Sequence, residues 1–287
     1  MFATSSCGTP LACRVQGRPR PARRLAVVPI EIESADDPRV ADYRGLREKP
    51  ENSEYFIAES ELVVGRLVTS KYKVRSFLLS PSRYERMQGV VDPVDAPVYV
   101  CSREVMQAIA GFDVHRGALA SASRRRNLTM MDALSGARRV VVLEGSNDLE
   151  NIGAIARSAR ALGFDAMLLD PTCADPLSRR SVRVSMGEIL HLKVVKCGYW
   201  PEPLEYIRNA GFETWALTPD AAANSLYDMG MPDKVALVAG AEGPGLTDAT
   251  RRLTEFDVRI PMHGGVDSLN LGHALAIAMA AVSLPVT

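Results

Sequence analysis

The chain alternates short apolar runs with segments in which apolar residues recur every three or four positions. Apolar runs long enough for buried strands occupy residues 140–143 and Val235–Ala239, and Val74–Leu79 is also predicted to be a strand. The segments between the runs have the period of amphipathic helices, as over residues 151–162. This alternation predicts an α/β fold with a parallel sheet.

A first α/β unit is predicted over residues 31–120. Its strands are expected at residues 55–58, 74–79 and 98–101, and its helices at residues 60–67, at 81–87 and after Ser102. Ser60 and Ser102 are residues that favour helix N-caps, and Pro81 favours a first helical turn. We expect a small α/β/α sandwich. Its basic side is either a solvated face or a phosphate-binding one, and consists of Arg66, Lys71, Lys73, Arg75, Arg83 and Arg86.

Residues 121–138 are predicted to link this unit to a second domain at residues 139–287. The linker begins without an apolar period and carries three adjacent arginines, residues 124–126. In the second domain, strand and helix alternate to a final helix over residues 269–283, which is apolar on nearly every face. We expect that helix to be buried, with Leu271, Leu275 and Met279 at or near an interface between two copies.

Composition narrows the class of protein. Hydrophobic residues make up 47% of the 287, enough for sizeable cores, and 34 Lys and Arg balance 34 Asp and Glu. The charge is uneven, because no acidic residue precedes Glu31 while five arginines do. Residues 1–30 therefore predict a disordered basic tail that could touch RNA; a transit peptide or a misassigned start codon would have the same composition.

The five cysteines are scattered and lack both C-x-x-C spacing and a His partner at ligand spacing. Neither a disulfide framework nor a zinc site is indicated, so a reducing, cytoplasmic location is expected. The longest apolar run is shorter than the roughly 20 residues that a membrane span needs. We therefore expect no membrane association.

Three segments of the second domain place glycines and small polar groups after predicted strands. The first is Asn-x-Gly-x-x-x-Arg, from Asn151 to Arg157; the second is Gly-x-Glu-Gly-x-Gly, from Gly240 to Gly245; the third runs from Ile260 through Asn270. Pattern alone makes Arg157 a solvated helix residue and Glu242 a loop carboxylate. The glycine loop is neither a dinucleotide fingerprint nor a phosphate loop, which disfavours NAD and ATP.

Taken in this order, the three segments resemble the motifs of the SpoU (SPOUT-class, TrmH-like) RNA ribose 2′-O-methyltransferases over residues 139–282. The resemblance implies a deep trefoil knot, a homodimer and S-adenosylmethionine as methyl donor. It also implies that the first unit is a substrate-binding domain of the ribosomal-protein type. The family usually continues Ser-Leu-Asn with Val-Ser, where this chain has Leu271-Gly272-His273.

The resemblance assigns candidate roles residue by residue. The catalytic positions are Asn151, Arg157, Glu242, Ser268 and Asn270. The donor-binding positions are Leu217, Thr218, Gly240, Glu242, Gly245, Ile260, Met262, Leu269 and Asn270. The RNA-facing positions are Arg124, Arg125, Arg126, Arg179, Arg180, Arg183 and Ser185.

The expected chemistry needs a guanidinium that orients the nucleotide and stabilises developing alkoxide charge, which suits Arg157. Asn151 and Ser268 would fix the orientation of Arg157, and no metal is expected. The 2′-hydroxyl distinguishes RNA, so RNA is the expected substrate, with ribosomal RNA favoured over transfer RNA by the first unit. Three alternatives stay open: a transfer-RNA methyltransferase, a non-catalytic RNA-binding or ribosome-assembly protein on this fold, and a small-molecule enzyme with a nucleotide cofactor.

Overall fold

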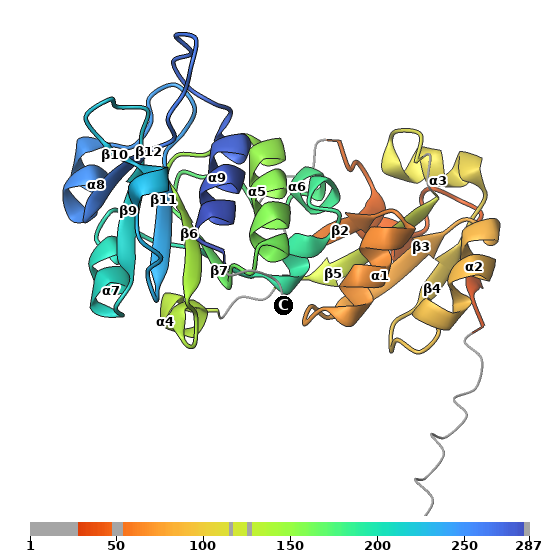
Figure 1. Cartoon of the computed structure of the whole chain (residues 1–287). Coiled ribbons are helices and arrows are strands. Elements are labelled where there is room, and N and C mark those ends of the chain that lie inside the picture. Colours follow the sequence, from red (N-terminus) through yellow and green to blue (C-terminus); the bar gives the residue numbers. More distant parts are fainter. Residues whose placement is uncertain (1–27, 48–53, 115–116, 125–127, 284–287) are drawn as a thin grey trace, which may run out of the picture.

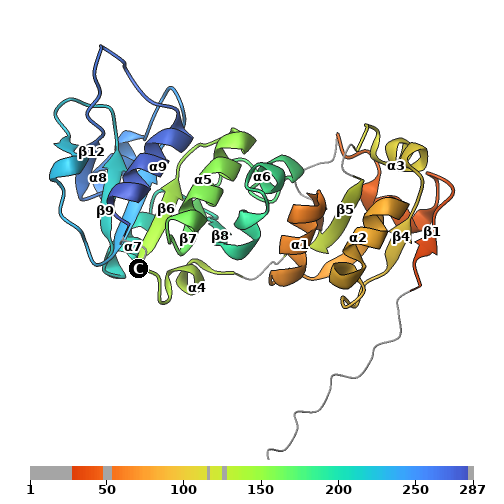
Figure 2. The ribbon, with the colours of Figure 1, turned by 45° about the vertical axis from the view of Figure 1, so that its right-hand side comes forward.

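Two β-sheets, one in each half of the chain, organise the fold (Figures 1 and 2). The computed structural model describes residues 28–47, 54–114, 117–124 and 128–283. Nearly all of the predicted tail, and the RNA-binding candidates Arg125 and Arg126, lie outside the described residues.

The first sheet has the order β1-β4-β3-β5-β2. Its strands are β1 (Ile30–Glu31), β2 (Tyr55–Glu59), β3 (Val74–Leu79), β4 (Val98–Val100) and β5 (Ala118–Ser123). Strands β1, β4 and β3 are parallel, whereas β5 is antiparallel to both β3 and β2. Strands β2, β3 and β4 fall within one residue of their predicted bounds.

Helices cover both faces of this sheet. They are η1 (Pro38–Tyr43), α1 (Glu61–Thr69), α2 (Pro81–Val91) and α3 (Arg103–Ala110). One apolar cluster joins α1 and α2 to one face, and a second joins η1 and α3 to the other. Both predicted caps form: the side chain of Ser60 accepts a hydrogen bond from Val63 N, and that of Ser102 from Val105 N.

Strand β5 contradicts the predicted start of the linker at residue 121. Residues 121–123 pair with β2, and β5 lies between β2 and β3 in the sheet. Its alanines, Ala118, Ala120 and Ala122, are fully buried. Small residues fit a crowded sheet interior but lack the β-branched pattern by which a strand is recognised. The predicted linker also contains the short helix α4 (Met130–Leu134), which a Thr129–Asp132 capping box begins.

The second sheet confirms the predicted parallel α/β architecture. Its order is β10-β12-β9-β11-β6-β7-β8, and every pairing is parallel. The strands are β6 (Arg139–Leu143), β7 (Ala166–Leu169), β8 (Lys193–Lys196), β9 (Glu213–Leu217), β10 (Asn224–Ser225), β11 (Val235–Ala239) and β12 (Phe256–Arg259). Strands β6, β9, β11 and β12 are neighbours, so the loops after them meet at one edge.

The helices of this half lie on both faces of its sheet. They are α5 (Leu149–Ala161), α6 (Arg179–Val184), α7 (Pro203–Asn209), α8 (Asp248–Leu253) and α9 (Leu271–Ala281), with the 3-10 turns η2 (Glu188–His191) and η3 (Leu226–Asp228). Helices α5 and α9 lie side by side over one face (Figure 1). Among the described residues, no helix is long and apolar enough to cross a membrane.

In the single chain, helix α9 is buried on one side, and its contact with a second copy remains a prediction. Leu275 and Met279 are fully buried in the apolar cluster of their own chain, and Leu271 nearly so. The three residues expected at an interface between copies therefore belong to the core. The exposed side carries His273, Ile277 and two alanines, Ala280 and Ala281.

Arginine–carboxylate pairs join the two halves. Arg179 of α6 pairs with Glu59 of β2, and Arg124 donates to Asp175 at 2.9 Å. Both carboxylates are buried, with residue exposures of 8% for Glu59 and 7% for Asp175. Residues of α1 and η2 also belong to one apolar cluster. The first unit is thus docked on the second rather than only tethered to it.

Gly153 determines how closely α5 and α6 approach. A Cβ at Gly153 would lie 2.7 Å from Ser181 O and 2.8 Å from Val184 Cβ. We expect Gly153→Ala to destabilise the chain by about 1–3 kcal/mol, because the backbone of α6 must move away. Gly65→Ala is the control, since nothing lies within 4 Å of a Cβ there. It should be neutral or stabilising by up to about 1 kcal/mol. Denaturant unfolding of both variants measures the difference, and equal stabilities would contradict this account.

Candidate active site

A cavity of about 480 Å³ lies at the edge of the second sheet where β9, β11 and β12 end. The strand ends and the two loops that follow β11 and β12 form its wall. All nine residues that the sequence assigned to the donor line it: Leu217, Thr218, Gly240, Glu242, Gly245, Ile260, Met262, Leu269 and Asn270. Ser268 lines it as well. The structure therefore brings together residues as far apart in sequence as Leu217 and Asn270.

The loop after β11 doubles back on itself. Gly245 N donates to Ala241 O at 3.0 Å, which closes the loop. A Cβ at Gly240 would lie 2.1 Å from the carbonyl carbon of Gly245. Gly243 and Gly245 both have positive φ, at 90° and 72°. The close approach excludes a Cβ at Gly240, and the left-handed φ values favour glycine at Gly243 and Gly245, so the shape of the wall depends on all three glycines.

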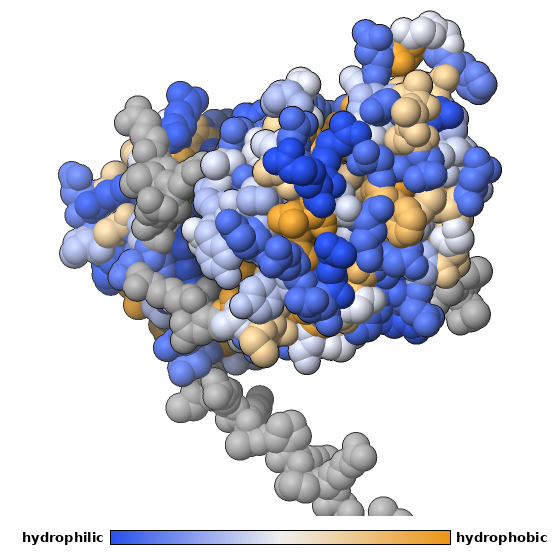
Figure 3. All heavy atoms as spheres, turned by 90° about the vertical axis from the view of Figure 1, so that its left-hand side faces the viewer, coloured by the Kyte–Doolittle hydropathy of each residue, from blue (hydrophilic) through white to orange (hydrophobic). Residues whose placement is uncertain are grey.

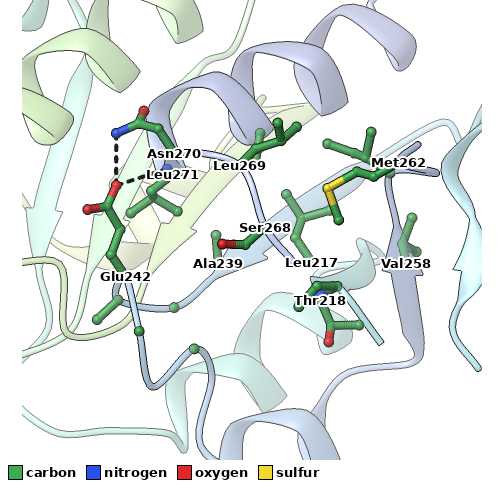
Figure 4. A pocket seen from close by; sticks show the side chains of 17 residues that line it. Leu217, Thr218, Ala239, Glu242, Val258, Met262, Ser268, Leu269, Asn270 and Leu271 are labelled. Carbon is green, nitrogen blue, oxygen red and sulfur yellow. Dashed lines mark hydrogen bonds between the residues drawn. The ribbon is translucent and has the colours of Figure 1, made fainter. Parts of the chain in front are cut away.

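Glu242 connects all three motif segments. Its Oε1 accepts hydrogen bonds from Asn270 Nδ2 at 2.8 Å and from Leu271 N at 3.1 Å (Figure 4). The same oxygen accepts a third hydrogen bond from Asn151 Nδ2 at 3.1 Å. Asn270 Nδ2 also donates to Asn151 Oδ1 at 3.1 Å. Asn270 is the N-cap of α9, where its side chain accepts from His273 N. The predicted catalytic residues Asn151, Glu242 and Asn270 thus form one hydrogen-bonded group.

The cavity has a polar end and an apolar end. Glu242 and Asn270 stand at one end, and Leu217, Val258 and Met262 lie toward the other (Figure 4). The loop between β12 and α9 projects beyond the body of the protein (Figures 1 and 3). A ligand with an apolar or aromatic part and a polar tail would match this lining.

Arg157 is not at the cavity of its own chain. It is exposed on α5 and makes no hydrogen bond or ion pair with another described residue. It follows Asn151 by six residues, about 9 Å along a helix that rises 1.5 Å per residue. The position opposite the apolar stripe was correctly predicted, whereas the fixing of Arg157 by Asn151 and Ser268 is not present in the single chain.

The RNA-facing candidates are mostly engaged within the protein. Ser185 is fully buried and donates its hydroxyl to Val182 O, so it cannot meet a substrate in this conformation. Arg124 and Arg179 are held in the pairs between the two units. Arg180 and Arg183 remain exposed, Arg180 in a surface pair with Glu150 and Arg183 3.7 Å from Glu59. Among the described candidates, Arg180 and Arg183 are therefore the ones exposed enough to meet a substrate, while Arg125 and Arg126 lie outside the described residues.

The described cysteines are poorly suited to nucleophilic chemistry. The three described cysteines are free and buried, and burial raises the pKa of Cys101 and Cys197 to about 11 and that of Cys173 to about 12. A buried thiol of such high pKa is a poor nucleophile. Within the described parts of the chain, no group of three or more His, Cys, Asp and Glu could hold a metal.

Sequence reasoning missed part of the wall. The missed lining residues are Pro219, Ala239, Ala241, Gly243, Val258, Leu271 and Ala274. Most are direct neighbours of predicted positions, so adjacency in sequence was the available signal. Val258 is different, because it reaches the cavity through the pairing of β12 with β9.

The sequence of the chain matches known RNA methyltransferases. The profile of the SpoU rRNA Methylase family matches residues 138–280. An uncharacterised tRNA/rRNA methyltransferase of Mycobacterium tuberculosis is 40% identical over 86% of this chain and 89% of its own length. A 23S rRNA (guanosine-2′-O-)-methyltransferase of Burkholderia is 32% identical over 61% of this chain and 72% of that protein.

A solved structure has the same fold. The rRNA methyltransferase of Sinorhizobium meliloti bound to S-adenosylmethionine superposes with a TM-score of 0.75, at 23% identity, over 88% of this chain and 96% of that one. The cavity at the motif loops, the match of the profile and the 40% identical relative agree. This chain belongs to the SpoU rRNA methylase family and is an RNA methyltransferase.

Proposed function

We propose that the chain methylates a ribose 2′-hydroxyl in structured ribosomal RNA. The observation that carries this proposal is the group formed by Asn151, Glu242 and Asn270 at the polar end of a cofactor-sized cavity. The 32% identical Burkholderia relative, named for 2′-O-methylation of 23S rRNA, supports the choice of atom and of RNA. Transfer RNA is the second candidate, because the M. tuberculosis relative is named for both RNAs.

The cavity residues fit the methyl donor. Its volume of about 480 Å³ lies within the range of small-molecule sites, roughly 300–1,000 Å³. Leu217, Ile260 and Leu269 offer apolar surface to an adenine ring, and the glycine loop after β11 offers backbone at close approach. When bound, S-adenosylmethionine supplies a methyl group that its sulfonium charge already activates.

The chain must then orient the target hydroxyl and favour loss of its proton. Arg157 is the residue for this task, since a guanidinium binds phosphate and stabilises developing alkoxide charge but is too basic to act as a base. Asn151 is already fixed by Glu242, and Ser268 stands on the opposite loop. These positions supply the polar groups around the target ribose.

Assembly as a homodimer is part of the proposal. Arg157, Ile277 and His273 are exposed on the adjacent helices α5 and α9. An apolar Ile277 beside alanines on the solvent face of α9 favours coverage by a second copy. The trefoil knot, the role of the first unit as the RNA-binding domain, the absence of a metal and the cytoplasmic location are further predictions, which the family resemblance motivates.

Glu242 should control donor affinity. Glu242→Ala removes the acceptor that holds Asn151, Asn270 and Leu271 N, and we expect the dissociation constant for S-adenosylmethionine to rise tenfold or more, about 1.4 kcal/mol. Glu242→Gln keeps one oxygen and should have the smaller effect. Titration calorimetry measures both, with the exposed Glu202→Ala as control. Unchanged affinity for S-adenosylmethionine in Glu242→Ala would show that the Glu242 carboxylate has no role in binding the methyl donor.

Arg157 should control the rate without controlling stability. Arg157→Ala leaves no cavity, so the unfolding temperature and donor affinity should stay at wild-type values. Methyl transfer should fall a hundredfold or more, about 2.7 kcal/mol. The assay is single-turnover transfer of labelled methyl to ribosomal or transfer RNA from a strain that lacks the gene, with the methylated ribose mapped. Arg160→Ala, one turn further along α5, is the matched control and should keep the wild-type rate. A wild-type rate in Arg157→Ala would refute the assignment.

Light scattering at micromolar concentration tests the dimer. We expect twice the chain mass of 31.2 kDa for the wild type. Ile277→Asp places a charge on the exposed side of α9 and should yield the monomer mass. Leu62→Asp, which changes an exposed leucine of the first unit, should leave the mass doubled. A wild-type monomer would overturn the dimer and leave the methyl-transfer proposal to the rate measurement above.

A further inference from the structure

Glu144 is a buried carboxylate outside the cavity for which the chemistry above gives no role. It follows β6 directly, is 5% exposed and does not line the cavity. Within the described residues it has no ion pair. Instead, its two oxygens accept four hydrogen bonds, a number that leaves the buried charge well solvated by the protein.

The donors to Glu144 come from two distant parts of the chain. Oε1 accepts from Trp200 Nε1 at 2.8 Å, from Thr250 Oγ1 at 2.7 Å and from Thr247 Oγ1 at 2.9 Å. Oε2 accepts from a single donor, Thr247 N, at 2.9 Å. Thr247 is the N-cap of α8 and ends the loop that begins after β11. Glu144 therefore ties that end of the loop to β6.

The same residue also contacts the beginning of the loop. Glu144 N donates to Ala239 O at 2.9 Å, at the last residue of β11. A Cβ at Gly145 would lie 3.4 Å from Ala241 Cβ, so the chain after Glu144 packs on the loop itself. The loop in question, residues 240–246, supplies five lining residues of the cavity: Gly240, Ala241, Glu242, Gly243 and Gly245. Its two ends are thus held from one point outside the cavity.

We propose that Glu144 is a positioning residue that fixes the loop at residues 240–246 in the shape that binds the methyl donor. It acts through the backbone of Thr247 and has no contact with the donor. Glu242, in the middle of the loop, is fixed by its hydrogen bonds at the cavity, whereas Glu144 binds both ends of the loop from outside the cavity. This inference rests on the donor occupying the cavity of the proposed function.

Glu144→Gln isolates the anchor to Thr247 N. A glutamine keeps one oxygen for Trp200 and the threonine hydroxyls, but its amide N–H then faces Thr247 N–H, donor against donor. We expect the dissociation constant for S-adenosylmethionine to rise tenfold or more by calorimetry. The rate at saturating donor should stay within about threefold, because the reacting groups are unchanged.

Trp200→Phe is the matched control. This substitution removes the hydrogen bond from Trp200 Nε1 to Glu144 Oε1 and keeps the hydrogen bond from Thr247 N to Oε2. Its unfolding temperature should fall, as for Glu144→Gln, yet its donor affinity should remain within about twofold of wild type. Thr247→Pro supplies a second route, since φ of Thr247 is −68° and suits proline while the N–H is lost. It should lose donor affinity as Glu144→Gln does.

Three results would overturn the inference. The first is a folded Glu144→Gln protein whose affinity for S-adenosylmethionine is within twofold of wild type. The second is an equal loss of affinity in Glu144→Gln and Trp200→Phe, because equal losses would indicate only general destabilisation. The third applies if Glu144→Gln does not fold: a Thr247→Pro protein that binds S-adenosylmethionine with wild-type affinity would also overturn the inference. Failure of the wild type itself to bind S-adenosylmethionine would instead reject the proposed function.

Discussion

One carboxylate oxygen holds the site together. Glu242 Oε1 accepts from the start of α5, from the cap of α9 and from the first backbone N–H of α9. Helix N-termini have unsatisfied N–H groups, which makes them natural partners for a carboxylate. Because these partners belong to separate segments, the cavity is complete only when β12, β9, β11 and β6 have assembled in that order in the sheet.

The parallel sheet and the glycines make that convergence possible. Every strand pairing in the second sheet is parallel, so the carboxyl ends of β9, β11 and β12 meet at one edge. The loop after β11 can then fold back only because Gly240 has no Cβ to strike Gly245. Gly240, Gly243 and Gly245 contribute backbone to the cavity wall, and Glu242 and Asn270 stand together at one end (Figure 4).

Much of this could be predicted from the sequence. The bounds of β3 and β11 were predicted to the residue, and the family resemblance identified ten residues that line the cavity. Strand β5 escaped because alternating alanine and serine lack a strand signature. Helix α9 looked buried all round because periodicity reports apolar content and not which neighbours are present.

Side-chain contacts between residues far apart in the sequence could not be predicted from sequence patterns. Arg179 and Glu59 are 120 residues apart, so the basic segment of α6 looked free to bind RNA. Glu144 looked like an ordinary polar residue after a strand, because its partners at Trp200 and Thr247 follow 56 and 103 residues later. Such contacts depend on tertiary structure, which a pattern of single residues does not contain.

The contact between the two halves has a thermodynamic consequence. Separating them would expose the apolar surface shared by α1 and η2 and leave the carboxylates of Glu59 and Asp175 without their cations. Both changes cost free energy, the first in proportion to apolar area and the second because a buried charge loses its partner. Neither half can therefore melt without weakening the other. We therefore expect the two architectural units to unfold as one cooperative unit.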